Sequence, residues 1–280
     1  MWSWWFHHDL RAQTPSTADW ERIAQAIKRD FKPGDRVAIT PFWATMGERA
    51  FVQADLNYQY VRWVAREDWP DEKRLWVVSA YRRFVDRNEF IERGAKPEAS
   101  FSLGPIKVER FLLPWARPTF RFDEQLPNAE VFHKRGANEI SCGEWNGDEA
   151  RFICNQQADW QHVGQLTVEA GEALRSAIWA HPINNTDIRI RYHQVPLQDV
   201  IVVHHGLTEY AAAEPEGAPV FIDIYVDGRN ITRLTQRNVR GWLRDEVYYR
   251  GKPGELHEVE FSISMPRDGR RHFMFNAYTQ

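Results

Sequence analysis

The histidines that could bind a metal lie in one segment of the chain, at His181, His193, His204 and His205. A metal site needs two or three imidazoles that converge, usually with a carboxylate. Because neighbouring residues of a strand point to opposite faces, His204 and His205 cannot easily bind one ion together. We interpret these histidines as structural or surface residues and expect no metal and no cofactor.

Two pairs of acidic residues could serve as the acid and base of a hydrolase. Asp223 and Asp227 share one face of an expected strand, and Glu258 and Glu260 share the outward face of a later strand. Paired carboxylates can hydrolyse a glycosidic bond that they flank. Acids on the outer face of a strand more often serve solvation, and the short motifs of nucleophilic hydrolases and nucleotide-binding loops are absent. We predict no catalytic residue, and a carbohydrate-active hydrolase is the alternative.

A third set of residues suits ligand binding: Trp242, Tyr248, Tyr249 and Arg250. They lie in a segment that loses strict apolar–polar alternation, which is typical of a sheet edge or a sandwich rim. Aromatic rings stack on the apolar faces of sugars, and charged groups bond to the hydroxyls. We predict these four as ligand-binding residues, and the alternative is ordinary packing.

The elements that position these residues follow a period of two. Val220, Ile222, Ile224 and Val226 point one way, and the residues between them point the other way. The same alternation recurs from about Thr119 to the C-terminus and indicates half-buried antiparallel strands. We predict a jelly-roll-like β-sandwich domain over residues 119–280, an architecture that binds ligands more often than it transforms them.

The first part of the chain shows a different pattern. Expected helices at 19–31, 48–66 and 82–93 alternate with apolar strands at 36–40, 75–79 and 106–112. Such alternation predicts a small three-stranded parallel Rossmann-like α/β unit over residues 19–114. Pro114 and Pro118 confine the joint to the second domain. The fold class is therefore α/β plus all-β.

The two cysteines, Cys142 and Cys154, lie on either side of Asn146-Gly147. An Asn-Gly pair favours a tight hairpin, which brings residues equidistant from the turn face to face. We predict a disulfide worth roughly 3 kcal/mol, with two buried thiols as the alternative. A disulfide favours an oxidising compartment.

Residues 1–18 form an expected aromatic arm with Trp2, Trp4, Trp5 and Phe6. Tryptophan suits the membrane–water interface, so we predict membrane or partner contact there. The segment is either the edge of an upstream membrane helix or an arm packed on the protein. The formal net charge is −3 without a basic face, and we expect no nucleic-acid partner.

The stretch from Ala218 to Thr235, a strand followed by an Asp-Gly turn and a second strand, resembles an element of jelly-roll carbohydrate-binding modules. Two further stretches, Ile178–Leu207 and Asp19–Ala44, are similar to soluble extracytoplasmic tails of bacterial mannosyltransferase-like membrane glycosyltransferases and hypothetical membrane proteins. The resemblance implies an extracytoplasmic (periplasmic or cell-surface) location and a non-catalytic role. It assigns no binding residue.

Together these observations predict a non-catalytic accessory protein at a membrane surface that recognises a glycan or a protein partner in the cell envelope. One alternative is a structural subunit of a larger membrane or envelope assembly, because exposed aromatic surface also marks permanent contacts. The hydrolase is the second alternative.

Overall fold

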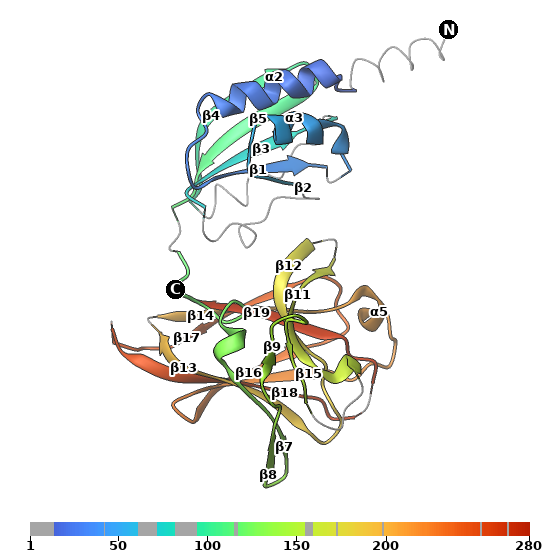
Figure 1. The fold of residues 1–280 in the computed structure, drawn as a ribbon, viewed down its shortest axis with the longest axis vertical. Helices are drawn as coiled ribbons and strands as arrows, with labels where there is room; N and C mark the ends of the chain where they lie inside the picture. Colours follow the sequence, from blue (N-terminus) through green and yellow to red (C-terminus); the bar gives the residue numbers. More distant parts are fainter. Residues whose placement is uncertain are drawn as a thin grey trace. The chain divides into compact units, whose positions relative to one another are not determined.

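The computed structural model describes residues 14–41, 43–60, 72–81, 94–114, 117–154, 159–171, 173–197, 199–252, 254–267 and 269–280. The chain divides into two compact units, residues 1–117 and 118–280, each with its own hydrophobic core (Figure 1). The predicted contact residues Trp2, Trp4, Trp5 and Phe6 and the helix expected at 82–93 lie outside the described residues. Within the described ranges, no helix has the length and apolarity needed to cross a bilayer.

The first unit contains a five-stranded mixed sheet. Its strands lie in the order β2 (Tyr58–Tyr60), β1 (Asp35–Thr40), β3 (Arg74–Ser79), β5 (Ile106–Leu112) and β4 (Lys96–Leu103). Both β2 and β3 pair with β1 in parallel, whereas β5 pairs with β3 and with β4 in antiparallel fashion.

The prediction of a three-stranded parallel Rossmann-like sheet is therefore wrong for its third strand, Ile106–Leu112. The chain enters this strand through a hairpin with β4, which turns at Gly104 with φ +58°. Every residue of β4 is at least partly exposed, and its short alternation of Ala99, Phe101 and Leu103 with serines was not interpreted as a strand. The hairpin reverses the chain, and β5 consequently runs against β3.

Two helices cover this sheet's core cluster. Helix α2 (Thr17–Lys28) begins at Ser16, which forms a capping box with Asp19, and it buries Trp20, Ile23 and neighbouring residues as the helical spacing predicted. Helix α3 (Glu48–Gln53) follows the short 3-10 helix η1 (Thr45–Gly47) and ends well before residue 66. Asp55 adopts φ +50°, and the chain continues as β2 rather than as the longer helix that we expected.

The second unit is a β-sandwich of two antiparallel sheets, which confirms the prediction of a β-sandwich (Figure 1). The eight-stranded sheet contains, in spatial order, β17 (Leu243–Tyr248), β14 (Val200–Leu207), β19 (Phe273–Thr279), β12 (Ala173–Ala180), β11 (Val163–Ala170), β10 (Arg151–Phe152) and β9 (Trp145–Asn146), with β6 (Phe120–Arg121) beside β19. The six-stranded sheet contains β16 (Arg229–Gln236), β15 (Val220–Val226), β18 (Leu256–Ser264), β13 (Asp187–Pro196), β7 (Glu130–Arg135) and β8 (Asn138–Ser141). Short helices η3 (Leu126–Asn128), η4 (Asp159–Gln161) and α5 (Glu209–Ala212) lie in its connections.

The sandwich core is built from the inward rows of both sheets. Phe261 of β18 and Phe275 of β19, which belong to opposite sheets, lie with ring centroids 5.1 Å apart. Phe122 packs edge-on against Tyr192 and Phe261, with centroids 4.9 Å away in both cases. These rings exclude water between the sheets, and their burial supplies the main driving force for the fold.

The predicted disulfide between Cys142 and Cys154 is present. Strands β9 and β10 form the expected hairpin, in which Asn146 pairs with Arg151. Cys142 follows β8 of the six-stranded sheet, whereas Cys154 follows β10 of the eight-stranded sheet. The bond therefore links the two sheets at one edge of the sandwich.

A substitution at Gly171 tests how closely two turns of this sandwich pack. It lies in the β11–β12 turn with φ +58°, and an added Cβ would lie 2.6 Å from the Cα of Gly241. We expect Gly171→Ala to destabilise the second unit by about 3 kcal/mol, because left-handed strain and a backbone clash add together. Gly136→Ala is the matched control: its φ is +61° with no atom within 4 Å, and we expect a loss of about 1 kcal/mol. Urea unfolding measures both losses. Equal losses of unfolding free energy in the two variants would exclude a close approach of Gly171 to Gly241.

Candidate ligand-binding site

Strand register brings three connecting segments together at one end of the sandwich. The chain crosses between sheets after β12, through residues 181–186, and after β18, through residues 265–272. The end of β12 pairs with the starts of β11 and β19, because Ala180 lies opposite Val163 and Trp179 lies opposite Met274. Helix η4 directly precedes β11 and therefore meets both crossovers.

These segments enclose a pocket of about 370 Å³, which is a suitable size for a small ligand. His181 and Met265, which are 3% and 7% exposed, lie among its buried residues, whereas Trp160 is 48% exposed. The lining comprises Trp160, Gln161, His181, Pro182, Ile183, Asn184, Met265, Gly269 and Arg270.

Trp160 is held in place by aromatic and backbone contacts. Its ring lies edge-on to His181, with centroids 4.3 Å apart, and its carbonyl accepts a hydrogen bond of 3.1 Å from the Trp179 indole. The ring of His272 lies 5.5 Å from that of Trp179 and 5.6 Å from that of His181. The half-exposed Trp160 indole therefore lies beside a group of packed aromatic rings.

The described lining of the pocket carries one positively charged side chain. Burial lowers the pKa of His181 to about 4, and burial together with the charge of Arg270 lowers the pKa of His272. Both imidazoles are therefore largely neutral at pH 7. That one charged side chain is Arg270, whose guanidinium lies over the Tyr210 ring, 5.8 Å from the centroid.

This combination of groups can bind a sugar ring. The Trp160 indole offers an apolar face for stacking, and the amides of Gln161 and Asn184 offer both donors and acceptors. No carboxylate lies among the described lining residues, so the pocket as described holds no acid–base pair for glycoside hydrolysis.

The sequence-predicted residues Trp242, Tyr248, Tyr249 and Arg250 lie on or next to edge strand β17, and none of them lines this pocket. Trp242 and Tyr248 share a face but are six residues apart, which is about 20 Å along a strand. Trp242 packs on a small apolar cluster below Arg175, and Tyr249 packs against the core with its ring 5.2 Å from that of His257. Tyr248 is 74% exposed. As a ligand-binding set these residues stay a prediction.

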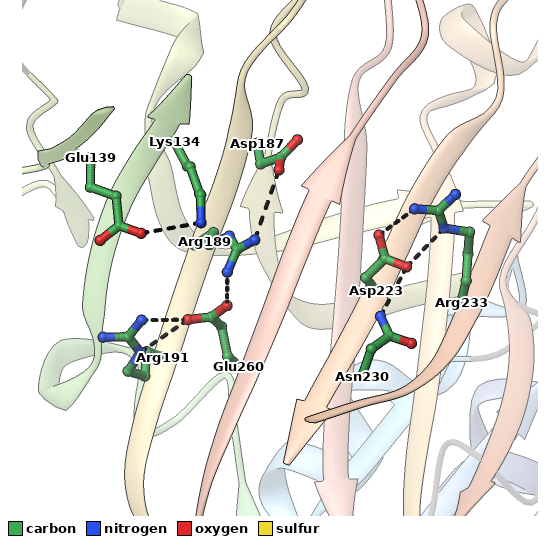
Figure 2. Close-up of polar contacts among 9 residues, drawn as sticks. All are labelled: Lys134, Glu139, Asp187, Arg189, Arg191, Asp223, Asn230, Arg233 and Glu260. Carbon is green, nitrogen blue, oxygen red and sulfur yellow. Dashed lines mark hydrogen bonds and ion pairs between the residues drawn. The ribbon is translucent and has the colours of Figure 1, made fainter. Parts of the chain in front are cut away.

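Ion pairs hold two of the carboxylates that could have served catalysis (Figure 2). Glu260 accepts hydrogen bonds from Arg189 at 2.6 Å and from Arg191 at 2.8 Å and 2.9 Å. Asp223 accepts two bonds of 2.8 Å from Arg233 across β15 and β16. Both acids are only 5–6% exposed, so salt bridges already use their lone pairs.

Asp227 and Glu258, the other members of the two acidic pairs, also have basic neighbours. His257 holds Asp227 through a contact of 2.8 Å and thereby lowers the pKa of that carboxyl. Glu258 lies 3.3 Å from His193 and 3.5 Å from Arg191. All four acids that the sequence singled out are therefore engaged on the six-stranded sheet.

The predicted histidines do not converge on one point. His205 lies 2.7 Å from both Gln236 and Asp245, whereas His204 faces the other side of β14 beside Tyr278. His193 lies between two glutamates, each 3.3 Å away. Among the described residues, one group has ligand atoms close enough for a metal, and it comprises His133 and the two cysteines, whose sulfur atoms are already joined.

Sequence reasoning missed Trp160, Gln161, Asn184 and Arg270. One signal was available in the sequence, because an Asp-Gly pair favours a tight hairpin and Asp268-Gly269 is therefore interpreted as a hairpin turn. That interpretation is wrong: β18 and β19 belong to different sheets, so the segment is a crossover that carries Gly269 and Arg270 into the pocket. A turn signal between two long strands is found both in a hairpin within one sheet and in a crossover between two sheets.

Comparisons with known proteins leave the family open. No family model matches the chain, and no curated protein matches it, so the resemblance to membrane glycosyltransferase tails gains no support. The solved structures that are similar in part include the CBM51-2 and INT domains of Clostridium perfringens ZmpB in complex with GlcNAc. That match has 13% sequence identity and a TM-score of 0.33, and it covers 68% of this chain and 42% of that chain. They also include TmCBM61 in complex with β-1,4-galactotriose. That match has 12% sequence identity and a TM-score of 0.29, and it covers 58% of this chain and 95% of that chain. The chain spans less than half of the first structure.

Proposed function

We propose that the second unit is a non-catalytic glycan-binding module and that the pocket beside Trp160 receives a sugar ring. The observation that carries this proposal is the half-exposed indole of Trp160, fixed beside the buried side chains of His181 and Met265. Stacking on an indole favours the apolar face of a sugar, and the Gln161 and Asn184 amides can bond to its hydroxyls.

The geometry favours binding over hydrolysis. A glycosidase needs two carboxyl groups on either side of the bond that it cleaves. The described lining of the pocket contains none, and the buried acids Asp223 and Glu260 are bound to arginines. The described residues therefore support recognition rather than turnover.

The proposal includes an accessory role at a membrane surface outside the cytoplasm. The Cys142–Cys154 disulfide supports this setting, because such bonds persist in oxidising compartments. Trp2, Trp4, Trp5 and Phe6 are the proposed membrane or partner contact, since tryptophan favours the interface between lipid and water.

A protein partner in the cell envelope is the second candidate, and the exposed side chain of Tyr248 on edge strand β17 favours it. Edge strands have unpaired backbone groups, and tyrosine is enriched at protein interfaces. Under this alternative the chain would be a structural subunit of a larger assembly.

Substitution of Trp160 separates these candidates. We expect Trp160→Ala to weaken binding of the full chain to its best ligand from a glycan array by about tenfold or more, because the stacking surface is lost. Isothermal titration calorimetry measures the change, and Tyr248→Ala is the matched control, with an expected change below about twofold. The reverse pattern would assign the site to β17, and binding to no glycan would refute the proposed function.

A further inference from the structure

Arg270 is placed at the pocket before any ligand arrives. Its guanidinium lies over the ring of Tyr210, 5.8 Å from the centroid, and donates a hydrogen bond to the Tyr210 hydroxyl. Tyr210 belongs to helix α5, whose first residues are tied to the 265–272 crossover by the Thr208 N–H, which donates to the His272 carbonyl at 3.1 Å. The arginine is therefore oriented by the fold.

Most of the hydrogen-bonding capacity of Arg270 is unused within the described residues. A guanidinium has five N–H donors, and the bond to Tyr210 is the one that a described residue accepts. No described carboxylate lies within ion-pair distance of it, whereas the partly buried Arg189 and Arg191 of the six-stranded sheet pair with Glu260. Arg270 thus differs from those arginines in lacking an anionic partner among the described residues.

Among the described residues around Arg270, no acidic group offsets its charge. The pocket lining contains no described acid, and His181 is neutral because burial lowers its pKa to about 4. Arg267, on the same crossover, donates to the Glu216 carbonyl at 2.8 Å, and no described carboxylate forms an ion pair with it. The described residues therefore give the pocket a positive potential next to an aromatic wall.

We propose that the ligand of this pocket is an anionic sugar, with its ring against Trp160 and its carboxylate or sulfate ester bound by Arg270. This inference rests on the proposed function and adds the ligand class. A planar guanidinium can give two parallel hydrogen bonds to the two oxygens of a carboxylate or sulfate, whereas a neutral hydroxymethyl group offers a single uncharged oxygen. Arg270 is then the residue that determines specificity.

Matched oligosaccharides test the inference on the full chain. The neutral and uronate forms of β-1,4-linked gluco- and manno-oligosaccharides differ only in a hydroxymethyl group against a carboxylate, and a sulfated gluco-oligosaccharide forms the third arm. In the series that binds, we expect the anionic member to bind at least about tenfold more tightly at low salt, and this advantage to shrink severalfold in 1 M NaCl. Tighter binding of the uronate than of the sulfated sugar would identify the anionic group as a carboxylate, and the reverse order would identify it as a sulfate ester.

The variant Arg270→Gln should reduce binding of the anionic sugar by about tenfold and change binding of the neutral form by less than about twofold. Arg267→Gln is the matched control, because it removes a positive charge from the same crossover without touching the pocket lining. Equal binding of both forms, or equal loss in both variants, would overturn the anionic ligand and leave glycan binding intact. If neither these oligosaccharides nor any glycan on the array binds to the chain, the proposed function itself is refuted.

Discussion

Acidification from pH 7 to pH 5 should lower the free energy of unfolding of the second unit by about 4 kcal/mol through His133 and His181 alone. Burial lowers the pKa of both imidazoles to about 4 in the folded state, from an ordinary value of 6.5. Between these values the unfolded chain binds a proton that the folded chain does not bind. Stability is therefore complete above about pH 6.5 and is lost as the pH falls toward 4.

Each histidine accounts for about 2 kcal/mol of this loss at pH 5, and the still more buried His204 acts in the same direction. Urea unfolding at pH 7, 6 and 5 measures the effect. The variant His133→Gln, with a side chain that does not titrate, should lose about 2 kcal/mol less over this range than the wild type. Parallel pH profiles for the two proteins would show that His133 is already protonated, or exposed, in the folded state.

Loss of the disulfide should have a comparable effect at constant pH. The bond closes a loop with a sequence separation of 12, and its removal should destabilise the second unit by about 3 kcal/mol by restoring entropy to the unfolded chain. Because Cys142 and Cys154 follow strands of different sheets, the loss should appear as a lower midpoint of the whole sandwich transition.

Guanidinium unfolding with and without a reductant provides the measurement. The double variant Cys142→Ala with Cys154→Ala is the control, since its midpoint should match that of the reduced wild type and should not respond to reductant. An oxidised wild type that unfolds at the same midpoint as the double variant would contradict the account.

The sandwich could be predicted from sequence because its strands are half-buried. Strand β15 has the predicted boundaries, Val220–Val226, since every inward residue is apolar and an Asp-Gly turn follows. The first unit was harder to predict. The strand Ile106–Leu112 was found, but its direction depends on β4, where Ala99, Phe101 and Leu103 alternate with serines over a stretch too short and too exposed to be interpreted as a strand.

The pocket could not be predicted because no local pattern defines it. Trp160, Asn184 and Arg270 come from segments that meet only after strand register and two crossovers between the sheets are fixed. Local reasoning instead selected Trp242 and Tyr248, which lie near each other in sequence but extend along an edge strand. The disulfide was predictable for the opposite reason, since its hairpin is encoded within a dozen residues.

The most direct test of the central claim is a nuclear magnetic resonance titration of the full chain with the best-binding glycan. We expect the resonances of the Trp160 indole N–H and of the backbone amides of Asn184, Gly269 and Arg270 to shift together along one binding curve. Shifts confined to Trp242, Tyr248 and their neighbours on β17, with the Trp160 resonance unchanged, would contradict it.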